Sequence, residues 1–170
     1  MKIVFYVAMI IVSGALLMGC AGMRSDLVLD TAGPMPGQVA LVGSGSGTLI
    51  VYSAGKVNAD FNSLDSNRRE YSDYKILNSN RKLVKHVHNV TEDILEEPVA
   101  VELPAGKYFV VARSNDYGVV TIPVIIAPAQ QTILHLDGQN AWPNESLFSQ
   151  NNAVRLPDGE VVGWKYASSF

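Results

Sequence analysis

The sequence predicts an all-β protein built on a single antiparallel β-sandwich of about seven strands. The clearest evidence is the stretch 103–138, which holds three apolar runs at 107–113, 119–126 and 130–137. These runs are rich in Val, Ile, Tyr, Phe and Thr, which favour strands, and Asn, Asp, Gly and Pro separate them, as is typical of turns. Turn signals recur about every 8–12 residues, and no long amphipathic helical pattern accompanies them.

Four further strands are predicted, at 48–53, 71–77, 82–89 and 99–103. The second and third would form a hairpin around Asn78-Ser79-Asn80, because Asn tolerates the left-handed backbone of such a turn. Pro123 cannot donate a ladder hydrogen bond, which predicts that its strand is an edge strand or carries a bulge. Both faces of 107–113 are apolar, which predicts a central strand that is covered on both sides.

Residues 1–19 have the pattern of a signal peptide. Lys2 is their only charge, and the apolar run that follows is too short for a comfortable membrane span of about 20 residues. The run ends in Leu17-Met18-Gly19-Cys20, which resembles the lipobox of bacterial lipoproteins. The resemblance implies cleavage before Cys20, a diacylglycerol on its thiol and a fatty acid such as palmitate on its amino group. The alternative is an ordinary secretory signal, or a membrane anchor, followed by a chance cysteine.

Cys20 is the only cysteine of the chain, so the sequence offers no disulfide and no thiolate metal site. Ala21 follows it, and the resemblance to lipoproteins of enterobacteria-like systems then implies sorting to the outer membrane. Several acyl chains on one residue give stable anchoring. We therefore expect a lipid-anchored protein of the cell envelope, at the outer membrane.

The charge of the chain is mildly acidic. Lys and Arg number 13 against 16 Asp and Glu, a net charge of −3. Removing the signal peptide removes Lys2, which leaves 12 against 16, or −4. This balance argues against nucleic-acid binding and against a basic patch pressed to anionic lipid.

The expected organisation has four parts: a signal peptide at 1–19, a lipidated tether at 20–46, the β domain at 47–138 and an irregular C-terminal tail at 139–170. Within the tether, 26–30 could form a short strand or a docked segment. The run Gly43–Gly47 precedes a strand and lacks the Lys of a phosphate loop, so a flexible linker or the lead-in to that strand is favoured. Within the tail, Pro157-Asp158-Gly159 predicts a hairpin turn. We expect the tail and a long polar loop at 54–73 to make any partner contacts.

The pattern from Tyr74 to Asp137 resembles transthyretin-like, or carboxypeptidase-regulatory-like, β-sandwich domains. The matching motifs are Glu97-Pro98-Val99-x-Val101-x-Leu103, Leu103-Pro104-x-Gly106-x-Tyr108-x-Val110-x-Ala112, Tyr117-Gly118 and Leu134-His135-Leu136-Asp137. The chain is also similar to uncharacterised bacterial lipoproteins that carry one such domain behind a lipobox. The resemblance implies a stabilising, spacing or binding module without catalytic residues.

Few residues suggest chemistry. His86 and His88 share a strand face and, with His135, could supply three imidazoles to a metal. Alternation, however, places Leu83 and Val87 on the core face and both histidines in solvent, so we expect no metal site. Four carboxylates in one connection lack the spacing of a calcium loop and indicate a solvated segment: Glu92, Asp93, Glu96 and Glu97. Without a nucleophile motif, we expect neither a catalytic site nor a cofactor.

The sequence thus favours a non-catalytic envelope lipoprotein whose domain is a structural or protein-binding module. The alternative is a carbohydrate-binding module of an envelope glycan-handling system, with Trp142 and Trp164, or Tyr71 and Tyr74, as stacking surfaces. An enzyme with an unrecognised site is the third class. Buried tryptophans would favour the first hypothesis, and an exposed coplanar pair beside Asn or Asp would favour the second.

Overall fold

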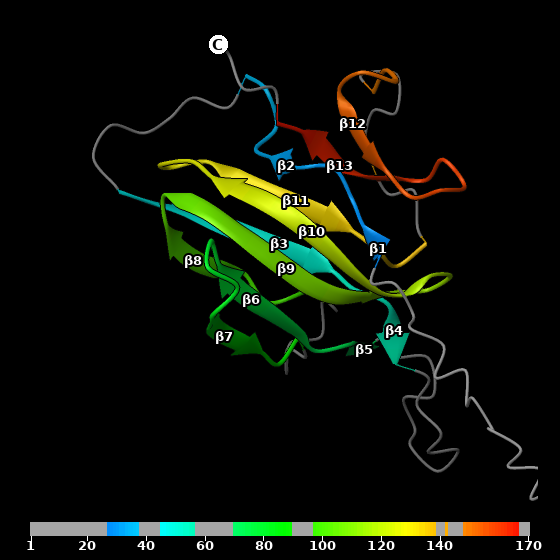
Figure 1. The fold of residues 1–170 in the computed structure, drawn as a ribbon, viewed down its shortest axis with the longest axis horizontal. Coiled ribbons are helices and arrows are strands. Elements are labelled where there is room, and N and C mark those ends of the chain that lie inside the picture. The colour runs from blue at the N-terminus through cyan, green and yellow to red at the C-terminus, as the bar shows by residue number, and fades with distance from the viewer. Residues whose placement is uncertain are drawn as a thin grey trace, which may run out of the picture.

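The computed structural model describes residues 27–37, 45–56, 70–89, 97–138, 142 and 148–166. In these residues the protein is all β, as predicted, and its strands form two main sheets and a short ribbon (Figure 1). The described residues include no helix long and apolar enough to cross a membrane. The signal peptide, Cys20 and three of the four carboxylates at 92–97 lie outside the described ranges.

The larger sheet has eight strands. Its order is β12-β13-β2-β10-β9-β6-β7, and β1 pairs with β10 beside β2. The strands are β1 (Leu27–Val28), β2 (Ala32–Gly33), β6 (Tyr74–Asn78), β7 (Leu83–Val87), β9 (Gly106–Ser114), β10 (Gly118–Ile126), β12 (Ala153–Arg155) and β13 (Val161–Lys165).

The smaller sheet has three strands in the order β11-β3-β8, which are β11 (Gln131–His135), β3 (Ser46–Tyr52) and β8 (Val101–Pro104). A ribbon of β4 (Gly55–Lys56) and β5 (Glu70–Tyr71) closes the two ends of the expected 54–73 loop. Residues 57–69 of that loop lie outside the described ranges.

One hydrophobic core joins the two sheets. It contains Leu49 and Val51 of the smaller sheet and Val110 and Ile122 of the larger sheet, all fully buried. Successive side chains of a strand point to opposite faces of its sheet, and these four point into the space between the two sheets. Along β3, half-buried and buried side chains therefore alternate. Each such side chain contributes about 1.5–3 kcal/mol when fully buried, which makes this core the main stabilising feature.

The pairing is mixed, which corrects the antiparallel expectation. β11 runs parallel to β3, and β1 and β2 run parallel to β10. Parallel neighbours need a long crossover, and the chain that joins β3 to β11 passes through the strands of the larger sheet. Its last step is the short connection 127–130, which carries the chain from β10 in the larger sheet to β11 in the smaller sheet. Ala129 has a φ of 53° in this connection.

Pro123 lies on an interior strand with a continuous register to β9, so the prediction of an edge strand or bulge was wrong. The chain tolerates the proline because of where its nitrogen points. The carbonyl of Thr121 faces β1, where it accepts from the amide of Leu29, and a residue two positions along the strand faces the same side. β1 pairs with Val120 and Thr121, and β2 pairs with Val124, so Pro123 lies in the gap between them.

The expected tether at 20–46 contains ordered sheet. Residues 27–33 supply β1 and β2, Ala32 is fully buried, and Leu29 belongs to the main core. Strand β3 begins at Ser46, so the end of the Gly-Ser run leads into a strand, which was one of its two expected roles. The short strand offered at 26–30 is confirmed by β1, whereas β2 was missed because two residues are too few to show a period.

Local turn chemistry was predicted in part. Asn78 accepts at its side-chain oxygen from the amides of Asn80 and Lys82, at 3.0 and 2.9 Å, but the left-handed residue of the hairpin is Arg81, with φ 61°.

β9 is central as predicted, yet its outer side is only half-buried at Phe109 and Val111.

The tail hairpin is confirmed. Strands β12 and β13 pair around the turn that holds Pro157-Asp158-Gly159, where Gly159 has a φ of 98°. The amide of Glu160 donates to the Asp158 carboxylate at 3.0 Å. Because β13 pairs with β2, this part of the tail extends the larger sheet.

Candidate functional site

The tail packs through a second, aromatic core, which we call the tail core: Trp142, Phe148, Ala153, Val161 and Trp164. Trp142 and Trp164 are each only 6% exposed. The Phe148 ring stacks on Trp164 with centroids 4.3 Å apart, and the Trp142 indole N–H donates to the carbonyl of Val161 at 3.0 Å. The tryptophans therefore pack as structural residues, as the sequence favoured.

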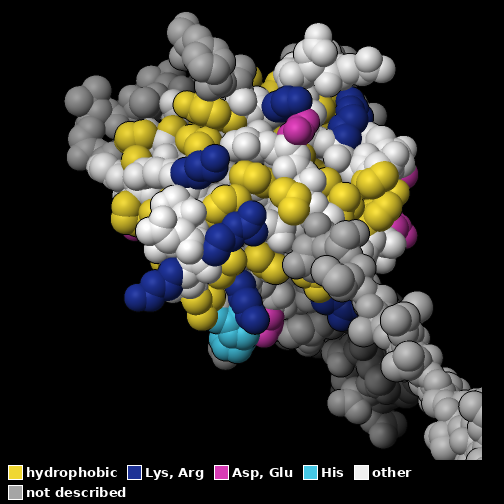
Figure 2. Space-filling model, in the orientation of Figure 1, with side chains coloured by type: hydrophobic (Ala, Val, Ile, Leu, Met, Phe, Trp, Pro, Cys, Tyr) yellow, Lys and Arg dark blue, Asp and Glu magenta, His cyan; other side chains and the backbone are white. Residues whose placement is uncertain are grey.

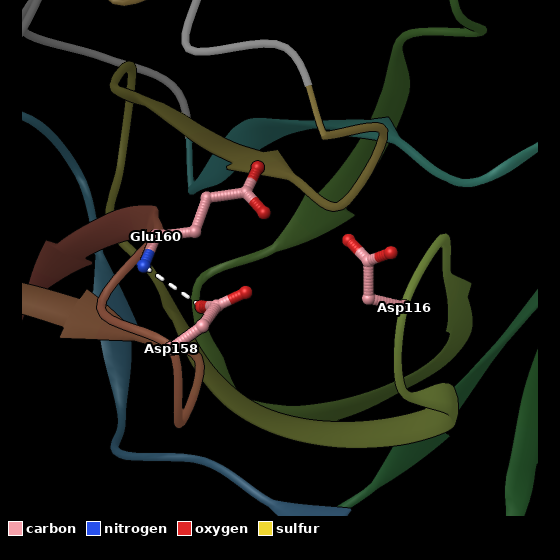
Figure 3. A group of neighbouring side chains, drawn as sticks. All are labelled: Asp116, Asp158 and Glu160. Atoms are coloured by element: carbon pink, nitrogen blue, oxygen red, sulfur yellow. Dashed lines mark hydrogen bonds between the residues drawn. The ribbon is translucent and has the colours of Figure 1, made fainter.

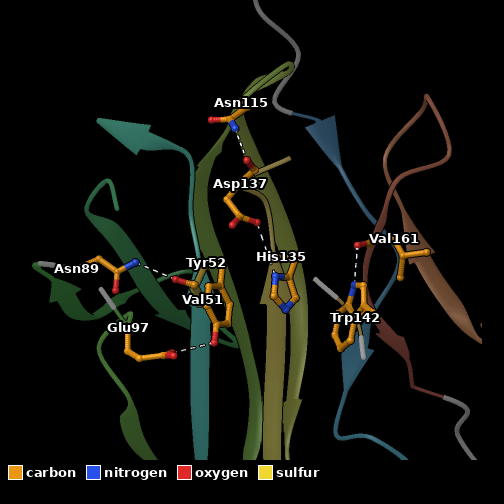
Figure 4. Close-up of polar contacts among 9 residues, drawn as sticks. All are labelled: Val51, Tyr52, Asn89, Glu97, Asn115, His135, Asp137, Trp142 and Val161. Atoms are coloured by element: carbon orange, nitrogen blue, oxygen red, sulfur yellow. Dashed lines mark hydrogen bonds and ion pairs between the residues drawn. The ribbon is translucent and has the colours of Figure 1, made fainter. Parts of the chain in front are cut away.

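His135 connects the tail core to the smaller sheet (Figure 4). Its ring stacks on Tyr52 at 4.3 Å between centroids and meets the edge of Trp142 at 4.6 Å. Its Nδ1 lies 3.6 Å from Asp137 Oδ1, too long for a hydrogen bond, and both side chains are buried. Sequence reasoning placed His135 only with the other histidines and missed this aromatic stack.

Tyr52 donates its hydroxyl to the Glu97 carboxylate at 3.0 Å. Burial, and then this hydrogen bond to a carboxylate, raise the pKa of Tyr52 to about 12. Tyr52 is therefore a neutral donor at ordinary pH, and the pair holds the start of the 97–103 segment against β3.

The predicted stacking tyrosines are not on the surface. Tyr74 is 1% exposed in the main core, and burial raises the pKa of its hydroxyl. Tyr71 is 9% exposed and packs edge-on against Tyr52, with ring centroids 5.6 Å apart. Neither ring can receive a sugar face in this conformation.

The three histidines do not come together. His86 and His88 lie exposed with ring centroids 5.0 Å apart, and His88 Nδ1 is 3.0 Å from Asp73 Oδ2. His135 is on β11 in the other sheet. Leu83, which was expected on the core face, is 54% exposed, because β7 is the far edge of the larger sheet and its register shifts near Ile76.

A cluster that sequence reasoning did not find lies where two turns meet, and we call it the acidic group: Asp116, Asp158 and Glu160 (Figure 3). Asp116 comes from the turn between β9 and β10, and the other two come from the turn between β12 and β13. One oxygen of each lies within 4.8 Å of the others. Only the turn signals in the sequence could have marked these residues, since nothing in it pairs the two turns.

The acidic group borders a hollow of about 520 Å³, which Gly138, Phe148 and Arg155 also line. Burial, and then the charges of Asp158, Asp137 and Asp116, raise the pKa of the Glu160 carboxyl. Glu160 Oε1 is buried and has no hydrogen-bond partner among the described residues. Chemically, three carboxylates suit a hard cation such as Ca²⁺, which takes 6–8 oxygen ligands and would need water or carbonyl oxygens as well.

Glu160→Gln should stabilise the protein at neutral pH. The pKa of Glu160 is higher in the folded protein than its ordinary value of 4.5. Ionisation of Glu160 therefore lowers the free energy of unfolding as the pH rises from 4.5 through the raised pKa. Replacing the charge should therefore increase the free energy of unfolding at pH 7 by at most about 1 kcal/mol, since solvent screens this partly exposed group, with little change at pH 4. Urea unfolding across this pH range measures the effect.

The matched control is Glu102→Gln, an exposed carboxylate on β8 outside the acidic group. It should leave the free energy of unfolding unchanged across the same range. A loss of stability in Glu160→Gln at pH 7 would mean that the ionised carboxylate has a stabilising partner.

Comparison of the chain with protein-family models, with curated proteins and with solved structures found no match.

Proposed function

We propose that this protein is a non-catalytic lipoprotein of a bacterial cell envelope, anchored at the outer membrane through a lipid on Cys20. Its β domain, a sandwich of the transthyretin-like kind, serves as a structural or protein-binding module. The lipobox-like Leu17–Cys20 and the single cysteine support the anchor. The resemblance of 74–137 supports the fold type.

The observation that carries the module assignment is the tail core. The tail is the part of the chain that exceeds a minimal sandwich. Its two tryptophans are each only 6% exposed and pack in the same hydrophobic cluster. Glycan-binding modules present aromatic faces to the ligand, and the four rings proposed for that role are all buried. No specific observation supports the carbohydrate alternative.

The polar side chains of the interior act as ties between strands. Ser53 donates to the carbonyl of Ser72 at 2.6 Å, and Asn89 donates to the carbonyl of Val51 at 2.8 Å. The amide of Val99 donates in turn to the Asn89 side chain at 2.9 Å. These bonds join the two sheets through their loops, which fits a rigid scaffold that presents its surface to a partner.

Cys20→Ala should abolish lipid labelling. Cells that express the full chain would be fed radiolabelled palmitate, and the wild-type band should carry label because the thiol and the new amino terminus of Cys20 are acylated. The variant should remain an unlabelled, slower-migrating precursor. Ser13→Ala, a change within the signal region away from the cleavage point, serves as the control and should keep the label. Persistent labelling of Cys20→Ala would refute the anchor.

A further inference from the structure

We infer that the outer side of the larger sheet lies against the headgroups of an anionic membrane. This inference rests on the proposed lipid anchor and adds a second contact between the domain and the bilayer. The mildly acidic net charge argued against a basic patch that contacts anionic lipid. The structure gathers cations on one face despite the net charge of −3.

The strand register defines this face. Residues paired across neighbouring strands share a side of the sheet, and so do residues two apart on one strand. One row runs from Leu83 through Leu77 and Phe109 to Pro123, and the next runs from His86 through Lys75, Val111 and Thr121 to Val28. Two further pairs complete it: Lys107 with Ile125, and Arg113 with Val119. We call this set of residues the outer face.

The outer face is apolar and basic. Its side chains are mostly aliphatic or aromatic, and Val28, Leu83 and Val119 are each about half exposed, at 53%, 54% and 47%. Its charged residues are Lys75, Lys107 and Arg113, and the register places no carboxylate among its rows.

A fourth cation extends the set. Arg81 lies over the Phe109 ring, with its guanidinium carbon 4.0 Å from the ring centroid. Figure 2 shows Lys and Arg side chains spread among hydrophobic ones over the part of the molecule where Figure 1 places β6, β7 and β9.

The nearby carboxylates are already paired. Asp73 lies 3.0 Å from His88, and Asp30 lies 2.7 Å from Lys165. Within the described residues, no ion pair involves Lys75, Lys107 or Arg113. These three cations are therefore available to an anionic partner outside the domain.

A lipid surface fits this face better than a compact ligand does. The face is a broad sheet surface, and exposed aliphatic side chains among Lys and Arg suit the boundary between headgroups and acyl chains. Its basic residues complement anionic phosphate groups, and each Lys or Arg near such a surface contributes about a fivefold factor in the binding equilibrium.

The anchor also places the face within reach of the bilayer. Cys20 is seven residues before Leu27, a distance of about 25 Å at most when the chain is fully extended. Leu27 pairs with Val120 on β10, which is itself a strand of the outer face. A lipid on Cys20 would hold this rim of the sheet close to the membrane surface.

The test uses full-length lipidated protein reconstituted into phosphatidylcholine vesicles with or without phosphatidylglycerol. Because lipid occupies the Cys20 thiol, Val119→Cys supplies one free thiol for a polarity-sensitive fluorophore on the outer face. Glu102→Cys supplies the matched site on β8, where the side chain is exposed on the other sheet. A nitroxide-headgroup lipid then quenches any fluorophore at the membrane surface.

We expect quenching at position 119 with phosphatidylglycerol, a marked loss of it without this lipid, and none at position 102. Combined Lys75→Glu, Lys107→Glu and Arg113→Glu should shift the docking equilibrium by about 100-fold or more and abolish the quenching, by the same fivefold factor per charge. Combined Lys75→Arg and Lys107→Arg keeps the charge and should keep the quenching.

Vesicle flotation separates the two proposals. Protein that does not float has no anchor, which overturns the proposed function and this inference together. Protein that floats with equal quenching at both positions, or with quenching at 119 that survives charge reversal, overturns the inference alone. One further result would overturn the inference alone. In it, the fluorophore at position 119 is not quenched by lipid in vesicles, but an acidic envelope protein shields it in cells.

Discussion

Trp164→Ala should lower the free energy of unfolding by about 3–5 kcal/mol, the usual cost of removing a large buried aromatic side chain. Trp164 is 6% exposed and stacks on Phe148. It also lies on β13 between partners on both sides, opposite Ala153 and Gly33. The cavity left by its removal would open at the junction of three strands, where the backbone pairing limits collapse.

Urea unfolding measures the change, with the fluorescence of the one remaining tryptophan as the probe. Its emission should shift to longer wavelength if the tail core loosens around Trp142. Tyr166→Ala is the control, because this aromatic lies just beyond the same strand but is 42% exposed, and it should cost less than about 1 kcal/mol. A loss below 1 kcal/mol for Trp164→Ala would mean that the tail is not part of the cooperative fold.

The sequence predicted the fold class because the core strands are long enough to show their pattern. β9 and β10 span nine residues each and were predicted nearly to their ends. Their side-chain types and the turn between them agree with each other, so local and tertiary preferences point the same way. The hairpin in the tail was predicted for the same reason, from a turn flanked by apolar residues.

The sequence could not predict which strands would pair. The two-residue strands β1 and β2 are too short to show a hydrophobic period. Their position is set by pairing with the edge of β10 that β9 leaves free. The parallel pairing of β11 with β3 depends on the connection 127–130, which carries the chain from one sheet to the other but has the sequence of an ordinary Pro turn. The position of Pro123 on an interior strand likewise depends on long-range pairing, that of β10 with β1, β2 and β9.

The candidate site was predicted less well than the fold, because it depends on contacts between distant turns. Asp116 and Asp158 are on separate hairpins, and only the packing of the tail brings them together. The sequence grouped His135 only with the other two histidines, whereas the structure buries it between Tyr52 and Trp142. The outer face was missed because net charge averages over a surface on which the cations are unevenly distributed.

Gly47→Ala should lower the free energy of unfolding by about 3 kcal/mol or more, because the site has no room for a side chain. A Cβ at this position would lie 2.2 Å from the carbonyl oxygen of Ala127 and 2.9 Å from that of Gln130. Both oxygens belong to the 127–130 connection between β10 and β11, which is tied to β3 by hydrogen bonds from Thr48 to Gln130 and from Ala129 to Ser46. Only glycine leaves enough room here for the connection to pass, which allows β11 to lie parallel to β3.

The matched control is Gly45→Ala, two residues earlier in the same Gly-Ser run, where a Cβ would meet nothing within 4 Å. It should stay within about 0.5 kcal/mol of the wild type in the same urea titration. A flexible linker, one of the two roles that the sequence favoured for this run, would tolerate both changes equally. Equal stability of the two variants would therefore contradict the packing of the 127–130 connection on β3, and with it the parallel placement of β11 beside β3.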